Sequence, residues 1–237
     1  MRKLVFIGIM AGVFSVANGE PIKLSSLEGS ERLQHSLETQ MANPFLNEVQ
    51  YYTYQHNLFN CGPTSIALAL NSLHVPAPKA ESLGNYTMFT YKNIFTESAI
   101  AKTGISEETV FKQPGLLLQQ LGKILNSFSG VTAKVYYANK YSESEMSALV
   151  INAIKSPNTV VLANIYRPAW GQPGGGHISP VSAYDEQTKS VLFMDVASFK
   201  TSGIIWVSLD ELYQAMNTKD GDKYRGLVIV NYQRPKN

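Results

Sequence analysis

The sequence predicts an α+β fold with a helical N-terminal lobe and a mainly antiparallel sheet in the C-terminal lobe. Helix-spaced apolar residues dominate the first half, whereas strand-like runs dominate from His177 onward. The chain has 237 residues, of which 44% are hydrophobic and 16% charged, so it is long and apolar enough for a sizeable core. The sequence has no tandem repeats and no low-complexity tract, and we expect one globular domain over residues 20–237.

The N-terminal segment 1–19 has the pattern of a secretory signal peptide. Arg2 and Lys3 precede a short apolar run over residues 4–16, and Ala17-Asn18-Gly19 places small residues before a cleavage point. We therefore expect cleavage after Gly19 and export to the periplasm or the cell exterior, with no membrane association of the mature form. The alternative is a retained membrane anchor, for which the apolar run is short.

The charge balance argues against a nucleic-acid partner. The chain carries 20 Lys and Arg against 18 Asp and Glu, and loss of Arg2 and Lys3 with the signal would make the two signs equal. Nucleic-acid binding depends on a concentrated basic surface that neutralises phosphates, and the remaining sequence has no run of Lys or Arg. We therefore exclude nucleic acid as a partner.

The clearest helix begins at Cys61. In the segment CGPTSIALALNSL, the residues Ile66, Leu70 and Leu73 recur with helical spacing and predict a buried stripe. Pro63 fits only within the first turn, because an interior proline would lose a backbone hydrogen bond and clash with the preceding turn. The thiol is therefore expected at a helix N-terminus.

The remaining elements follow from periodicity and capping. Residues 20–60 predict a polar, partly helical lead-in, and a second apolar helix is expected over about 116–125. Two serines followed three residues later by glutamate form capping boxes, which predict a helix over about 144–155 and a short helix that ends near Met216. Strands are predicted at 131–137, 159–165, 178–184, 191–196, 204–207 and 226–232, with a polar turn at 185–189 closing a hairpin.

Cys61, the only cysteine, is predicted to be a nucleophile. The unpaired N–H groups and positive dipole end of a helix N-terminus favour the thiolate and lower the pKa of the thiol. Gln55 lies upstream, where its carboxamide and the backbone N–H of Cys61 would form a two-donor oxyanion hole. The alternative for a lone cysteine is a small buried hydrophobic residue. A single thiol excludes internal disulfides and multi-cysteine zinc sites.

His177 is the predicted base. It follows Gly174-Gly175-Gly176 and begins a strand, so three residues without side chains leave the approach to its ring open. His35 and His56 lie in polar stretches that are expected to be exposed. His74 lies near the C-terminus of a helix, where an imidazolium complements the dipole. These three histidines are therefore assigned structural roles.

Asp195 is predicted to orient the His177 ring. It lies in the segment VLFMDV, across the predicted hairpin, so neighbouring strands would bring its carboxylate to the imidazole. A carboxylate in an apolar strand needs a partner, and pairing with the ring would fix the tautomer and stabilise the imidazolium. The alternative is an aspartate that ends its strand at a turn. With Cys61, these residues form the nucleophile, base and orienter of a cysteine acyl-transfer enzyme.

Longer motifs make the chain resemble a known family. The segments NCGPTSIALALNSL, FTYKNIF, GGGHISPVSAYDEQTKSVLFMDVASFK, LDELYQAMNT and YRGLVIV, in that order, resemble the catalytic domain of phytochelatin synthases over about residues 24–232. The resemblance implies a papain-like fold with a triad of Cys61, His177 and Asp195 and with Gln55 in the oxyanion hole.

The same resemblance implies a set of substrate-binding residues, which are Asn164, Arg167 and Gly176 in the cleft with Asp220 and Arg225 nearby. An arginine in a cleft suits a substrate carboxylate through bidentate hydrogen bonds. The alternative for Arg167 and Arg225 is an exposed surface charge.

The resemblance also implies glutathione, γ-Glu-Cys-Gly, as the substrate. Cys61 would attack the Cys–Gly carbonyl, His177 would protonate the departing glycine, and the γ-Glu-Cys group would pass to water or to a second glutathione. It implies no tightly bound cofactor and no metal site on the protein, with cadmium or zinc acting as glutathione thiolate complexes. The chain resembles the short bacterial forms, in which hydrolysis dominates, and we expect a monomer or homodimer.

Two other functions remain open at this level. A papain-like peptidase that trims double-glycine leaders would explain the CGPTS helix and Gln55, but not the block from Asp185 to Lys200. A non-catalytic module that binds glutathione or metal thiolates would need no base. Ligand binding that survives loss of both Cys61 and His177, in a chain without turnover, would favour the binding module.

Overall fold

A computed structural model describes residues 21–84, 86–200 and 203–235; the predicted signal segment 1–19 lies outside them. Within these residues, seven strands form one sheet in the order β1-β6-β5-β4-β3-β9-β2, and every neighbouring pair is antiparallel. A separate hairpin joins β7 and β8. The predicted α+β class with a mainly antiparallel sheet is confirmed. No helix in the described part of the chain has the length and apolarity needed to cross a bilayer.

The strands are β1 (Ile22–Lys23), β2 (Val131–Tyr137), β3 (Thr159–Tyr166), β4 (Gly176–Asp185), β5 (Ser190–Met194), β6 (Ile204–Ser208), β7 (Lys219–Asp220), β8 (Lys223–Tyr224) and β9 (Gly226–Tyr232). The helices are α1 (Leu27–Glu38), α2 (Asn43–Glu48), α3 (Cys61–Ser72), α4 (Glu97–Thr103), α5 (Glu107–Lys112), α6 (Leu118–Leu125), α7 (Glu143–Lys155) and α8 (Leu209–Met216). The six longer strands (β2 to β6 and β9) and the helices α3, α6, α7 and α8 lie close to their predicted positions. The short strands β1, β7 and β8 and the helices α4 and α5 were not predicted.

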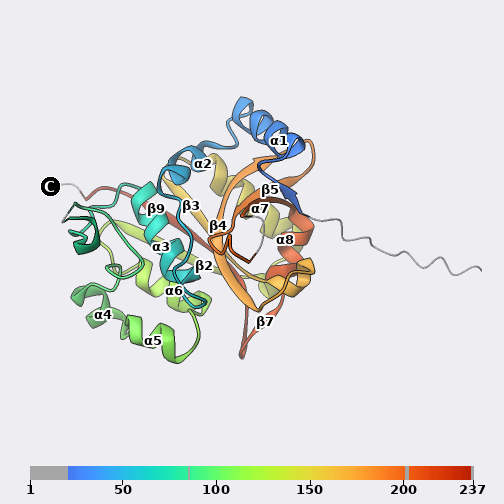
Figure 1. Cartoon of the computed structure of the whole chain (residues 1–237). Coiled ribbons are helices and arrows are strands. Elements are labelled where there is room, and N and C mark those ends of the chain that lie inside the picture. The colour runs from blue at the N-terminus through green and yellow to red at the C-terminus, as the bar shows by residue number, and fades with distance from the viewer. Residues whose placement is uncertain (1–20, 85, 201–202, 236–237) are drawn as a thin grey trace, which may run out of the picture.

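Both faces of the sheet are covered by helices. Along β3, Val160 and Leu162 point into the cluster that contains α3 and α6, and Val161 and Ala163 point into the cluster that contains α7 and α8. Figure 1 shows these two pairs of helices on opposite sides of the strands. Strand β3 is therefore buried along nearly its whole length and carries apolar residues on both faces, as expected for a strand covered on both sides.

Helix α3 is enclosed on all sides. Every residue from Cys61 to Ser72 is buried, so the predicted one-sided stripe was too narrow. The helix packs against β4, and the Ser65 hydroxyl donates to the Ile178 carbonyl over 3.1 Å. This contact fixes the first turn of α3 beside the beginning of β4.

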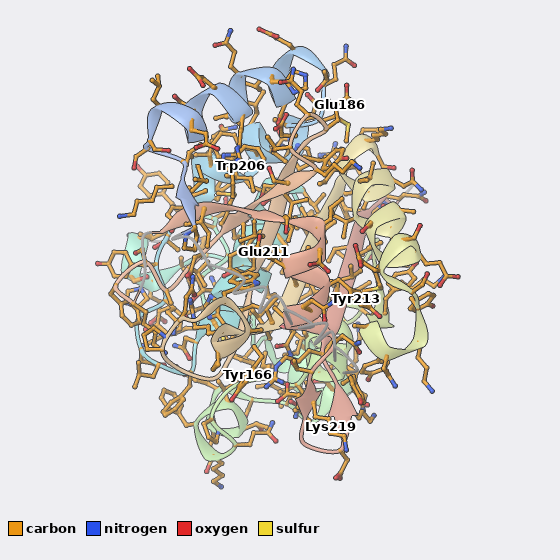
Figure 2. The ribbon with its side chains drawn as sticks, turned by 90° about the vertical axis from the view of Figure 1, so that its right-hand side faces the viewer. Tyr166, Glu186, Trp206, Glu211, Tyr213 and Lys219 are labelled. Carbon is orange, nitrogen blue, oxygen red and sulfur yellow. The ribbon has the colours of Figure 1, made fainter. Side chains whose placement is uncertain are left out.

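The two ends of β4 lie at opposite ends of the molecule. Figure 2 shows Glu186, in the turn after β4, at one end, and Tyr166 and Lys219 at the other. Tyr166 pairs with Gly176, the first residue of β4. The start of β4, which carries His177, therefore lies at the end that holds the β7–β8 hairpin.

The polar lead-in forms α1 and α2 rather than an exposed stretch. His35 on α1 was expected to be exposed, but its Nδ1 lies 2.5 Å from Asp185 Oδ1 and its side chain is only 19% exposed. Asp185 also accepts from the backbone N–H of Thr188. His35 therefore docks α1 onto the β4–β5 turn, which agrees with a structural role.

Glu48 gives the fold a pH-dependent contribution to stability. Its side chain is fully buried where α2 meets β4, and it accepts a hydrogen bond from Ser182. Burial raises the pKa of Glu48 from 4.5 to about 8 against the opposing effect of the Ser182 hydrogen bond. Between these two pH values the folded chain holds a proton that the unfolded chain has released. The free energy of unfolding therefore falls as the pH rises through this window and levels off above about pH 8.

Replacing Glu48 by glutamine should remove this pH dependence, because the amide stays neutral and still accepts from Ser182. Relative to the parent chain, the variant should gain about 1 kcal/mol per pH unit between about pH 5 and pH 8. Urea unfolding at several pH values measures the difference, with Glu81→Gln, on an exposed residue, as the matched control. An identical pH dependence in the parent and Glu48→Gln proteins would contradict the assignment.

Candidate active site

Cys61 is the first residue of α3, with Asn60 as the N-cap. Its residue surface is 8% exposed. Burial raises the pKa of the thiol, but the hydrogen bond and positive charge of His177, together with the backbone at Ile178 and Gly62, outweigh that effect. The pKa of Cys61 therefore lies below its ordinary value. The structure places this thiol at a helix N-terminus, as predicted, and against an imidazole.

The His177 ring lies between Cys61 and Asp195. Its Nε2 is 2.8 Å from Asp195 Oδ1, and the ring also interacts with the Cys61 thiol. Burial lowers the pKa of His177, but the hydrogen bonds and charges of Asp195 and Cys61 raise it by more than burial lowers it. The pKa of His177 therefore lies above its ordinary value. A lowered thiol pKa beside a raised imidazole pKa favours a thiolate–imidazolium pair.

Asp195 holds the ring through a buried network. It stands just beyond the end of β5, so the predicted strand over 191–196 was too long. Its Oδ1 accepts from His177 Nε2, from Arg167 Nη2 at 2.7 Å and from the Ala197 N–H at 2.8 Å. Burial raises the pKa of Asp195, but His177 and Arg167 together hold it well below its usual range. The carboxylate is therefore ionised at every physiological pH.

Arg167 lies elsewhere than the resemblance implied. Arg167 is 1% exposed. Its guanidinium donates hydrogen bonds to Asp195 and, over 2.7 Å from Nη1, to Gln172 Oε1. Its backbone N–H donates to the Gly175 carbonyl over 3.1 Å, which anchors the glycine segment beside His177. The structure thus places Arg167 behind the triad, and neither a substrate-facing cleft position nor an exposed surface charge describes it.

Gln55 is buried beside the same network. Its residue surface is 2% exposed, and its backbone N–H donates to the Val196 carbonyl over 2.7 Å, next to Asp195. The side-chain Nε2 donates to the Asn57 carbonyl over 2.5 Å. A carboxamide has two N–H groups, so one remains for another acceptor.

The other four substrate-binding candidates gather at the start of β4. Asn164 Nδ2 donates to Asp220 Oδ2 over 3.1 Å, and Arg225 Nη2 lies 3.2 Å from Asp220 Oδ1. A Cβ on Gly176 would stand 2.9 Å from Arg225 Nη2, so glycine leaves room for that guanidinium. The structure brings these four together, whereas the Arg167 guanidinium bonds to Asp195 and Gln172 instead. Arg225 is 5% exposed, which rules out a surface charge.

A family model described as phytochelatin synthase matches residues 16–227, nearly the whole chain. The chain belongs to the phytochelatin synthase family. Glutathione gamma-glutamylcysteinyltransferase 1 of Arabidopsis thaliana is 26% identical over 221 residues, covering 92% of this chain and 43% of that protein. The glutathione gamma-glutamylcysteinyltransferase of Schizosaccharomyces pombe is 27% identical over 208 residues, covering 87% of this chain and 47% of that protein. This phytochelatin synthase family chain spans less than half the length of these relatives.

Among solved structures, similarity was found to the N-terminal peptidase C39-like domain of a toxin secretion ATP-binding protein from Vibrio parahaemolyticus. The TM-score is 0.28 and the identity 15%, over 58% of this chain and 82% of that one. A superposition at that score establishes no common fold. In the chain itself, the helix that begins at Cys61 packs against the antiparallel sheet that carries His177.

Two polar residues of this phytochelatin synthase family site were not identified from the sequence. The Ser179 hydroxyl lies 2.8 Å from His177 Nε2 and accepts from the Val196 N–H. The Tyr52 hydroxyl donates to the Asp195 carbonyl over 2.6 Å. The position of Ser179, two residues after His177 on one strand and so on the same face, was a usable signal. Tyr52 had none.

Proposed function

We propose that this chain cleaves the Cys–Gly peptide bond of glutathione and transfers the γ-Glu-Cys group to water or to a second glutathione. The observation that carries the proposal is the Cys61–His177–Asp195 chain of contacts, in which the imidazole interacts with the thiol and its Nε2 lies 2.8 Å from the carboxylate. The named activity of the relatives supplies the substrate class.

In the first step, the Cys61 thiolate attacks the Cys–Gly carbonyl carbon. The developing oxyanion accepts from the Cys61 backbone N–H and from the second N–H of Gln55. His177 then gives its proton to the glycine nitrogen, the C–N bond breaks, and a γ-Glu-Cys thioester remains on the enzyme. Asp195, paired with Arg167, keeps the His177 ring oriented in both its protonated and its neutral state.

In the second step, the neutral His177 ring takes a proton from the acceptor. With water as the acceptor, the products are γ-Glu-Cys and the free thiol. With the amino group of a second glutathione as the acceptor, the product is a chain longer by one γ-Glu-Cys unit. We expect hydrolysis to dominate in this chain, as in the short bacterial forms that it resembles.

Asp220 and Arg225 suit the charged end of a γ-glutamyl group. That end of the substrate carries one ammonium and one carboxylate. Asp220 and Arg225 offer the complementary carboxylate and guanidinium, with Asp220 Oδ1 and Arg225 Nη2 3.2 Å apart. Asn164 fixes Asp220 from the other side. Because these residues lie at the start of β4, the γ-glutamyl end would sit beside Gly176 and His177, with the Cys–Gly bond toward Cys61.

The proposal extends to metals, location and assembly. Cadmium or zinc enters as the thiolate complex of glutathione, as substrate rather than as a resident cofactor. Among the described residues, no three His, Cys, Asp or Glu side chains are grouped to hold a metal ion. The pattern of residues 1–19 supports export. We propose a monomer or homodimer.

The assay is glycine release from glutathione by the purified chain, with and without cadmium, with the thiol products separated by chromatography. We expect free glycine and γ-Glu-Cys under both conditions, and longer γ-Glu-Cys chains when cadmium is present. A double-glycine leader peptide serves as the comparison substrate and should remain intact. Absence of glycine release in both conditions would overturn the proposal, and cleavage of the leader would replace it with a peptidase.

A further inference from the structure

Gln55, the proposed side-chain donor to the oxyanion, lies on irregular backbone. The segment 52–60 contains no helix or strand, so no ladder of hydrogen bonds fixes it. Two contacts hold its main chain beside the triad: the Gln55 N–H donates to the Val196 carbonyl over 2.7 Å, and the Tyr52 hydroxyl donates to the Asp195 carbonyl over 2.6 Å. Neither contact involves the Gln55 carboxamide, whose direction therefore depends on something else.

The Gln55 carboxamide is anchored at one end. Its Nε2 donates to the Asn57 carbonyl over 2.5 Å, whereas its buried Oε1 has no hydrogen-bond partner among the described residues. Because a carbonyl oxygen can only accept, this contact also determines which end of the carboxamide is the nitrogen. The Asn57 carbonyl therefore holds one N–H of Gln55 and directs the second N–H away from itself.

The Asn57 side chain holds that carbonyl in place. Its Oδ1 accepts from the Phe59 N–H over 2.8 Å, two residues further along the chain, and closes an Asx turn. An Asx turn restricts the backbone angles at its first residue, so it restricts the direction of the Asn57 carbonyl. Both carbonyl groups of Asn57 thus act in series, one on the turn and the other on Gln55.

We propose that Asn57 is a positioning residue for the oxyanion hole, holding the Gln55 carboxamide so that its second N–H meets the developing oxyanion. This inference rests on the proposed function and deepens it, because it names the residue through which that donor is held. Removal of one oxyanion donor typically costs about 10²-fold to 10³-fold in kcat, and a donor that is present but free to turn should cost less.

Two reagents that attack the same thiolate test the proposal on the full chain. With p-nitrophenyl acetate, the Cys61 sulfur adds to the ester carbonyl, an oxyanion forms, nitrophenolate leaves and an acetyl thioester remains. With iodoacetamide, a carbon–sulfur bond forms as iodide leaves, and no oxyanion develops. The ratio of the two rates therefore reports on the oxyanion hole, and neither reagent requires a glutathione site.

Asn57→Ala should lower acetylation about tenfold and leave alkylation within about twofold of the parent. Asn57→Asp, which keeps the acceptor oxygen of the turn, should recover most of the loss. Gln55→Ala should lose at least as much as Asn57→Ala, and adding Asn57→Ala to it should cost less than about twofold more, because Asn57 acts through Gln55. Asn139→Ala, on an exposed residue, is the matched control.

The proposal is overturned if acetylation is unchanged in Asn57→Ala, if both rates fall alike, or if the two substitutions act additively. It is overturned equally if iodoacetamide modifies Cys61 of the parent but p-nitrophenyl acetate does not. Asn57→Gln, which moves the side-chain carbonyl outward by one methylene, decides the matter if Asn57→Ala does not fold. A parent chain that shows the expected ratios but releases no glycine from glutathione would refute the proposed function and leave the role of Asn57 in place.

Discussion

Replacing Cys61 by serine is expected to abolish glycine release from glutathione, with a loss of at least about 10⁴-fold in kcat. The hydroxyl fits the same volume at the start of α3, but it does not ionise at neutral pH and cannot form the thiolate–imidazolium pair with His177. The fold should persist, since serine also suits a helix N-terminus. Circular dichroism and thermal unfolding provide the control.

The ionisation of the Cys61 thiol can be measured directly from the pH dependence of its alkylation by iodoacetamide. Because the pKa of Cys61 is lowered, the alkylation rate should reach half of its maximum at a pH below that of an ordinary thiol. In His177→Ala, burial acts on the thiol without the opposing imidazolium, so the midpoint should move to higher pH. A midpoint that is unchanged by this substitution would show that the ring does not tune the sulfur.

Replacing Arg167 by methionine is expected to lower the free energy of unfolding by about 3 kcal/mol, because it removes one partner of a buried ion pair and leaves the other in place. It should also lower kcat. With the guanidinium gone, the full negative charge of Asp195 acts on His177 and raises the pKa of the imidazolium further. The alkaline limb of the pH–rate profile should therefore move up by about half a unit or more.

Arg167→Lys should recover part of both losses, since one positive charge is restored without the forked geometry. Arg234→Met, on an exposed residue, is the matched control and should change stability by less than about 1 kcal/mol. A loss of stability with an unshifted alkaline limb would reduce Arg167 to a structural residue. A change in KM alone would return it to the substrate-binding role that the resemblance implied.

Much of the fold could be predicted because its signals are local. The β4–β5 hairpin, the capped helices α7 and α8 and the start of α3 follow from turn residues, capping boxes and a proline near Cys61. Helices α4 and α5 have 7 and 6 residues, too few for a clear apolar period. The enclosure of α3 depends on what packs around it, which no local pattern records.

The contacts within the site also divide into those that local sequence signals predict and those that they do not. His177 and Asp195 lie 18 positions apart across one hairpin, so their contact follows from strand pairing. The contact between Asp195 and Arg167 depends on how the segment after β3 folds back beneath the glycine segment, which sequence spacing does not indicate. That is why an arginine expected to face the substrate lies behind the triad instead.

The central claim is that the Cys61 sulfur carries the γ-Glu-Cys group during turnover. Rapid acid quenching of the chain with glutathione, followed by intact-mass and peptide mass spectrometry, measures this directly. The account predicts a population heavier by γ-Glu-Cys minus water, with the added mass on the peptide that contains Cys61 and absent from Cys61→Ser. Glycine release by the parent chain with no such adduct, or with activity retained in Cys61→Ser, would contradict it.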